Sequence, residues 1–265
     1  MPHPVAPRHR VPITLALALA AIARAAGAQS ISPPIAEYRE KPSGSFTVRN
    51  ESVFPLTVTL QPRGFRVTED GEVMVEPLDT ARVHLSLSTL SFRLQPRQGY
   101  TVFYDAKLDS LPAWFTVWTA ITGAKTAGGV NIRIELPHVV YAYQKQRLAS
   151  ADVRITSVRW LRQQRQVVVE LENTSPRLGR AQELLVTATG VPPVRGSPFP
   201  SFPGGRRRSV VPWTADSAPE RVTVRFDGFR LESGDIVVDD SPPPSPPAPS
   251  DSASPVAPRD STTAG

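Results

Sequence analysis

The feature that most constrains this chain is a two-residue alternation of apolar and polar side chains, which recurs along most of its length. It is cleanest in VNIRIEL, residues 130–136, where one face carries Val130, Ile132, Ile134 and Leu136 and the other carries Asn131, Arg133 and Glu135. Other short runs, such as LTVTL and WFTVWTAI, are rich in β-branched and aromatic residues and are separated by Gly, Pro, Asn and Asp. No window of useful length shows a helical period. The pattern predicts an all-β protein.

The predicted strands fall into two sets on either side of a polar stretch at residues 144–151. Each set has about the number of strands and the length of one immunoglobulin-like sandwich, which is roughly 100 residues. The sequence therefore predicts two immunoglobulin-like β-sandwich domains in tandem, over residues 29–147 and 148–240.

One phrase occurs once in each predicted domain. FTVRNESVFPLTVTL (residues 46–60) and VVVELENTSPRLGRAQELLVTATG (residues 167–190) each read as strand, Asn-x-Ser, Pro-marked turn and second strand. Asn50 and Asn173 lead the two turns, and an Asn side chain can bond the local backbone there. Both triplets match the glycosylation sequon, but the turn explains them without a glycan. We interpret the phrase as the same corner built once per sandwich.

The two ends of the chain are predicted to lie outside the fold. Residues 1–28 combine Arg8 and Arg10, an apolar stretch too short to cross a bilayer, and the small residues AGA before Gln29. This is typical of a cleaved secretory signal, so an exported protein is expected. No later apolar stretch predicts a membrane span in the mature chain. Residues 241–265 are rich in Pro and Ser and are predicted to be a disordered tail.

Composition argues against several functions. The formal charge of +6 includes three arginines of the predicted signal, so the mature chain carries about +3 and no nucleic-acid surface is expected. The chain has no cysteine, and only His84 and His138 lie beyond the signal. With no thiol, no nucleophile elbow, no phosphate loop and no zinc-ligand set, we predict no enzyme, no cofactor and no metal. The scattered carboxylates leave a paired-carboxylate hydrolase as the remaining enzymatic alternative.

The segment from Gly190 to Arg208 interrupts the alternation. It is Pro-rich, carries Phe199 and Phe202, and ends in Arg206, Arg207 and Arg208. It is expected to be a long loop, functional or disordered. Its arginines are either a contact for an anion or a partner, or a solvated charge run at the start of a strand.

Three stretches of the first predicted domain resemble the PapD-like family of periplasmic pilus-assembly chaperones, in the same order. They are ISPPIAEYREKPSGSFTVRNESVFPLTVTL, STLSFRLQPRQGYTVFYDAKLDSLPAWFTVWTAI and VNIRIELPHVVYAYQK. The resemblance covers residues 31 to about 146, and the second domain is similar only in length and strand pattern.

The resemblance implies a periplasmic, two-domain, ATP-independent chaperone that binds pilin-like or other surface subunits. It would lend each subunit its last first-domain strand, in cooperation with an outer-membrane usher. The physical mechanism is β-augmentation, in which an exposed sheet edge pairs with the client and alternate side chains fill the client's groove. The donor residues would be Val130, Ile132, Ile134 and Leu136. The alternation alone is better explained by an ordinary strand whose apolar side faces its own core, and it is the resemblance that brings strand donation level with this explanation.

The sequence departs from the family where a cleft Arg and Lys would hold the client's terminal carboxylate. ISPPIAEY has no basic residue, and His138 stands near the expected Lys. The candidate cleft contacts are Arg39, Lys41, Arg133, His138 and Lys145. The alternative function is a secreted two-domain structural or adhesive protein with no client cycle.

Overall fold

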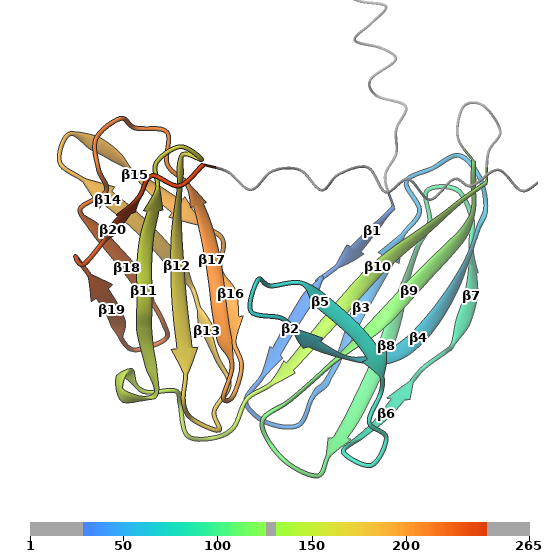
Figure 1. Ribbon diagram of the computed structural model, residues 1–265. Helices are drawn as coiled ribbons and strands as arrows, with labels where there is room; N and C mark the ends of the chain where they lie inside the picture. The colour runs from blue at the N-terminus through green and yellow to red at the C-terminus, as the bar shows by residue number, and fades with distance from the viewer. Residues whose placement is uncertain (1–28, 126–130, 243–265) are drawn as a thin grey trace, which may run out of the picture.

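The computed structural model describes residues 29–125 and 131–242, and nearly all of its regular structure is β-strand (Figure 1). The strands form two successive β-sandwiches, which confirms the predicted immunoglobulin-like fold class. In the described ranges the one helical element is the short 3-10 turn η1 (Ser150–Asp152), so no helix is long enough to cross a membrane. The predicted signal peptide and residues 243–265 of the predicted tail lie outside the described residues.

The first sandwich contains strands β1 to β10. They are β1 (Ser30–Ser32), β2 (Ile35–Tyr38), β3 (Ser43–Arg49), β4 (Leu56–Val67), β5 (Val73–Pro77), β6 (Val83–Leu87), β7 (Ser91–Leu94), β8 (Gly99–Leu108), β9 (Ala113–Lys125) and β10 (Asn131–Ala142). One sheet has the order β1-β3-β8-β6, and the other has the order β2-β10-β9-β4-β5 with β7 also on β4. The chain therefore changes sheets between β1 and β2, at Pro33 and Pro34.

The core of the first sandwich follows the alternation seen in the sequence. Alternate residues of β3, β4, β8 and β9 point inward, including Phe46, Val58, Val102 and Phe115, each of which is at most 1% exposed. Burying large side chains of this kind contributes about 2 kcal/mol each. The hydrophobic core, rather than any disulfide, therefore holds this domain together.

The second sandwich contains strands β11 to β20. They are β11 (Val153–Leu161), β12 (Gln166–Asn173), β13 (Gly179–Ala181), β14 (Glu183–Ala188), β15 (Val191–Gly196), β16 (Phe199–Ser201), β17 (Arg206–Pro212), β18 (Arg221–Arg225), β19 (Arg230–Ser233) and β20 (Val237–Asp239). The sheet β17-β12-β11-β20 packs on β15-β14-β18-β19 around a core that includes Val169, Val186 and Trp213, and β13 pairs with β16 at one end.

The expectation that residues 190–208 form a loop was wrong, because the structure has β15, β16 and the start of β17 there. Pro192, Pro193 and Pro200 lie in short strands that have a partner on one side only, where a missing N–H is tolerated, and Pro198 and Pro203 lie between strands. Phe199 is buried in the second core, whereas Phe202 lies against Trp114, with ring centroids 4.9 Å apart. This segment therefore supplies one aromatic side chain to each sandwich.

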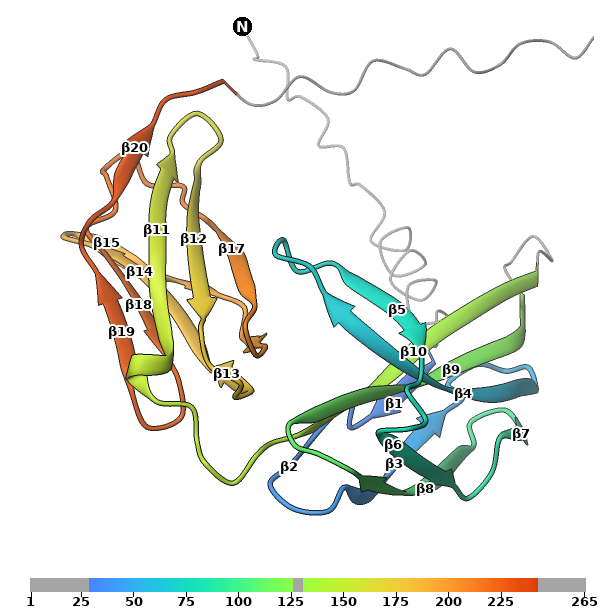
Figure 2. The same cartoon turned by 60° about the horizontal axis from the view of Figure 1, so that its bottom comes forward.

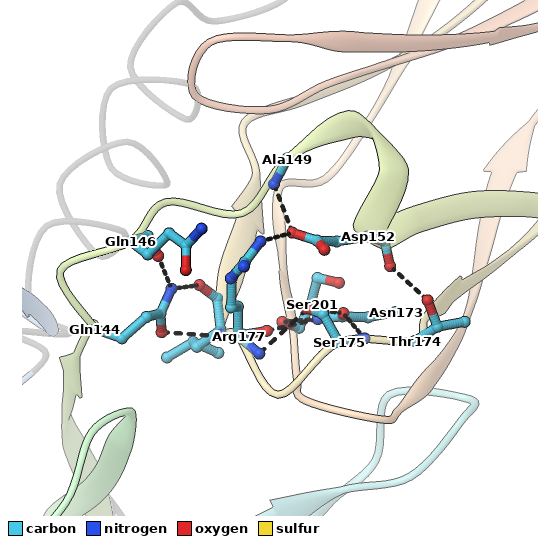
Figure 3. A network of polar contacts seen from close by, with 10 residues as sticks. Gln144, Gln146, Ala149, Asp152, Asn173, Thr174, Ser175, Arg177 and Ser201 are labelled. Atoms are coloured by element: carbon cyan, nitrogen blue, oxygen red, sulfur yellow. Dashed lines mark hydrogen bonds and ion pairs between the residues drawn. The ribbon is translucent and has the colours of Figure 1, made fainter.

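Asn50 and Asn173 have the same role in the two sandwiches. The Nδ2 group of Asn50 donates to the carbonyls of Phe54 and Gln95, and its Oδ1 accepts from the N–H and hydroxyl of Ser52. Asn173 repeats the pattern with Arg177, Ser201 and Ser175 (Figure 3). Both side chains are at most 1% exposed. The repeated phrase therefore encodes a buried turn, and a folded chain offers neither amide for glycosylation.

The two sandwiches lie side by side at an angle, and the β4–β5 hairpin points from the first toward β17 of the second (Figures 1 and 2). At its tip the carbonyl of Glu69 accepts from the Arg208 N–H at 2.6 Å, and Asp70 pairs with the Arg208 guanidinium at 2.7 Å. Phe65, Tyr141 and Leu178 form a small apolar cluster between the sandwiches. The candidate site lies next to this junction.

Candidate functional site

Strand β10 is paired along its whole length on one side but only at its end on the other. It pairs with β9 from Asn131 to Ala142, whereas β2 covers only Val139–Ala142. Strand β1 lies near it but belongs to the other sheet, where it pairs with β3. Within the described part of the chain, no backbone group bonds to the outer side of residues 131–138. We call this side of residues 131–138 the open flank.

The hydrogen bonds of β10 show which backbone groups face the open flank. The N–H groups of Val139 and Tyr143 donate to Pro34 and Tyr38, on the β2 side, at 2.9 and 2.7 Å. The His138 carbonyl accepts from the Thr116 hydroxyl, on the β9 side. The register shift between Ile132 and Ile134 places two residues of β9 opposite Arg133, so β10 itself keeps its alternation and the N–H groups of Asn131, Arg133 and Glu135 face the open flank. Pro137 also faces it, with a carbonyl but no N–H, which is an edge position that proline tolerates.

The predicted donor side chains lie beside these backbone groups. Ile132 is 38% exposed, whereas Ile134 and Leu136 are half-buried against the first core. Val130 lies outside the described residues. The two explanations of the alternation therefore do not exclude each other, because the apolar face packs on its own core while the strand keeps a free edge. The apolar side chains that a client could contact on this strand are therefore the half-buried Ile134 and Leu136 and the more exposed Ile132.

Most of the predicted cleft residues are paired elsewhere. Arg39 bonds Asp227 of the second sandwich at 2.7 Å, in a polar pocket that also holds Arg147 and Arg180. Lys41 pairs with Asp105, and Arg133 with Glu135, on exposed surface. Lys145 is exposed in the loop between the sandwiches. Because Glu37 and Asp227 already occupy the polar pocket, its arginines are poorly placed to bind a further carboxylate.

His138 is fully buried rather than exposed in a cleft. Its Nδ1 lies 2.8 Å from the Pro33 carbonyl, and its Nε2 lies 3.1 Å from the hydroxyl of Tyr104, which in turn contacts the Tyr38 hydroxyl at 2.8 Å. A neutral His138 ring fits this series of hydrogen bonds, with Nδ1–H donating to the Pro33 carbonyl and Nε2 accepting from the Tyr104 hydroxyl. The ring also stacks on Phe46, with centroids 4.5 Å apart. Burial lowers the pKa of His138, and the bond to Pro33 partly opposes this shift.

We expect the stability of the protein to fall on mild acidification because of His138. A histidine with a lowered pKa in the folded state binds its proton more readily when unfolded. Its contribution is therefore fully present above about pH 6.5 and declines as the pH falls below that value. The free energy of unfolding should decrease between about pH 7.5 and 5.5 in the wild type and stay nearly flat in His138→Gln. The control His84→Gln changes an exposed histidine and should keep the decrease; loss of the decrease in this control would contradict the assignment.

An apolar groove between the two sandwiches begins where the open flank ends. It has a volume of about 220 Å³ and is lined by Phe65, Val67, Gly71, Val73, Thr116, Trp118, Pro137, Val139, Tyr141, Pro200 and Arg207. We call it the Arg207 groove. Its lining includes Pro137 of β10 and Arg207 of β17, so it joins the candidate edge to the second sandwich.

Arg207 is the functional candidate that the sequence did not single out from its neighbours. Arg206 pairs with Glu172 at 3.2 Å, and Arg208 pairs with Glu170 and Asp70. Nε and Nη1 of Arg207 are instead buried with no hydrogen-bond partner among the described residues. Burial lowers the pKa of Arg207, against the opposing charge of Asp70. A half-buried guanidinium whose Nε and Nη1 donors are free can bind an anion through charge-assisted hydrogen bonds.

These features define a two-sandwich protein with an open strand edge that leads to a groove holding an unpaired guanidinium. No family model and no curated protein sequence matches the chain. Among solved structures, it is similar in fold to the YadV chaperone, with 10% identity and a TM-score of 0.47 over 77% of this chain and 97% of that one.

Two further similar structures are complexes. One is the CsuC–CsuE chaperone–tip adhesion subunit pre-assembly complex from archaic chaperone-usher Csu pili of Acinetobacter baumannii, with 13% identity, a TM-score of 0.45 and coverage of 80% and 100%. The other is the Salmonella enterica SafA pilin with the SafB chaperone, with 12% identity, a TM-score of 0.45 and coverage of 78% and 96%. Identity this low leaves the function to be inferred from this chain's own residues.

Proposed function

We propose that this protein is an ATP-independent periplasmic chaperone that caps subunits of a pilus or another surface structure by lending them strand β10. The observation that carries the proposal is the open flank, where the N–H groups of Asn131, Arg133 and Glu135 face outward beside Ile132. An edge of this kind pairs readily with another chain. Strand pairing of this kind is driven by binding alone and needs no nucleotide.

Arg207 is the residue we assign to the client's terminal carboxylate. The resemblance implies such an anchor, and the positions expected for it hold no free basic side chain. A client strand on the open flank would run toward Pro137, where the Arg207 groove begins. There its last apolar side chain would meet Trp118 and Val139, and its carboxylate would meet the unpaired donors of Arg207. An outer-membrane usher as second partner rests on the resemblance alone.

The experiment that tests the proposal is affinity capture of the tagged protein from its native host, with the partner identified by mass spectrometry. Ile132→Asp and Ile134→Asp should lose a strand-deficient surface subunit that the wild type retains, because a carboxylate would enter the client's apolar groove. Circular dichroism reports whether each variant is folded. The control Phe103→Asp changes an apolar residue that is 61% exposed on the other sheet and should retain the subunit. Equal capture by all variants would refute strand lending at β10, and absence of any subunit would favour the structural or adhesive alternative.

The assignment of Arg207 predicts opposite effects on stability and binding. Arg207→Met removes a half-buried charge with two buried, unpaired donors, so the free energy of unfolding should rise. The same change should weaken subunit binding about tenfold or more, since a charge-assisted bond to a carboxylate contributes about 1.5–3 kcal/mol. Arg206→Met, which removes an exposed arginine of the same strand, should change neither quantity greatly. Denaturant unfolding and titration with the captured subunit measure the two effects. Unchanged binding in Arg207→Met would exclude the anchor and leave strand lending intact.

A further inference from the structure

The open flank ends abruptly, and two neighbouring residues of β10 mark its end. Pro137 faces the flank without an N–H. The next outward N–H, of Val139, already donates to Pro34 at 2.9 Å. Glu135 is therefore the last residue of β10 that can donate to an added strand. Beyond it the flank offers only the Pro137 carbonyl before β2 occupies the sheet position.

The segment that occupies this position is held at both ends by His138. The carbonyl of Pro33, two residues before β2, accepts from the buried His138 ring at 2.8 Å. Tyr38, at the far end of β2, bonds Tyr104, which contacts the same ring. The ring has no exposed surface and stacks on Phe46. An incoming strand would have to break this polar chain inside the core before it could displace β2.

We propose that Pro137 and His138 form a stop that fixes the register of the added strand, an inference that rests on the proposed strand-lending function. Pro137 removes the donor at which pairing would continue, and His138 prevents β2 from peeling away. The partner is then an extended segment whose alternate carbonyls meet Asn131, Arg133 and Glu135. At Pro137 this segment must end or turn into the Arg207 groove. Both residues act by positioning, since neither presents a free donor to the client.

Amide hydrogen exchange measured by NMR tests the stop. The probe is a short peptide of alternating valine and serine, acetylated and amidated so that it carries no terminal carboxylate. In the wild type it should slow exchange at Asn131, Arg133 and Glu135 at least about tenfold, and leave Val139 and Tyr141 unchanged. In Pro137→Ala the new amide at position 137 should also become protected, and the peptide should bind several-fold more tightly.

His138→Gln tests the other half of the stop without any probe. Exchange at Val139 and Tyr141 should accelerate at least about tenfold, while Val140 and Ala142, which face β9, keep their protection. Added peptide should then protect Val139 as the strand slides past position 137.

If the peptide slows exchange at Asn131 and Glu135 in the wild type and also perturbs Val139, the stop is refuted and strand lending stands. Protection of no flank amide would refute both. Pro137→Ala keeps the test decisive if His138→Gln fails to fold, because position 137 is exposed.

Discussion

Glu135→Pro should abolish subunit capture while leaving the protein folded. The N–H of residue 135 faces the open flank and donates to no group among the described residues. A proline there therefore removes a donor that only a binding partner would use. Pro137, two residues further on the same flank, shows that β10 accommodates a proline in this orientation. Loss of the donor at position 135 leaves a client carbonyl buried without a partner, which costs about 1–3 kcal/mol, and the proline ring obstructs close approach as well. We expect binding to fall by more than about a hundredfold.

Two further variants separate loss of the outward N–H at position 135 from loss of the Glu135 side chain and from loss of stability. Glu135→Ala keeps the N–H and loses the bond from Trp118 Nε1 to the Glu135 carboxylate, so it should bind nearly as the wild type does. Ile134→Pro removes an N–H that faces β9 and should destabilise the first sandwich instead. Titration with the captured subunit and thermal unfolding measure the two quantities. Binding by Glu135→Pro at the level of Glu135→Ala would show that the client does not pair with this flank.

The sequence predicted the strands well, but it could not predict which of them is an edge. Alternation in residues 130–136 shows that one face is apolar, and both an inner and an outer strand can have that pattern. The free edge depends on where β2 stops pairing, which is decided by contacts of His138 with residues about a hundred positions earlier in the chain. Pro137 was the local clue, since a proline in a strand argues for an edge position.

The basic residues proposed for the cleft show a second limit of prediction from the sequence, because it does not show which of them are already paired. Arg39, Lys41 and Arg133 are basic residues near the expected place, but each has an acidic partner that the fold brings to it. Arg206, Arg207 and Arg208 are consecutive in the sequence and alternate in direction on β17. Arg206 and Arg208 therefore meet the carboxylates of the neighbouring strand, and Arg207 turns into the apolar groove. Only the assembled sheet distinguishes the unpaired arginine from its neighbours.

Asn173→Ala should destabilise the second sandwich by about 3 kcal/mol, because several buried backbone groups lose their only side-chain partner. The Asn173 amide donates to the carbonyls of Arg177 and Ser201 at 2.7 and 3.2 Å, and its Oδ1 accepts from the Ser175 N–H at 3.0 Å. Asn173→Asp should be at least as damaging, since it places a carboxylate oxygen against two carbonyls. Asn131→Ala, an exposed asparagine on β10, should change stability by less than about 0.5 kcal/mol. Denaturant unfolding compares the three variants.

Asn50→Ala, the matching substitution in the first sandwich, tests whether the turn of Asn173 also fixes the linker between the sandwiches, residues 144–152. Asn50→Ala removes the same set of bonds and should cost the first sandwich a similar amount. Of the two turns, only that of Asn173 bonds the linker within residues 29–125 and 131–242. Gln144 bonds both the N–H and the carbonyl of Leu178, and Arg177 bonds Asp152 at 2.6 Å (Figure 3). Asn173→Ala should therefore also speed amide exchange at Leu178 and raise protease cleavage between residues 144 and 149, whereas Asn50→Ala should do neither. Equal linker cleavage in the two variants would show that the second turn stabilises its own sandwich and nothing more.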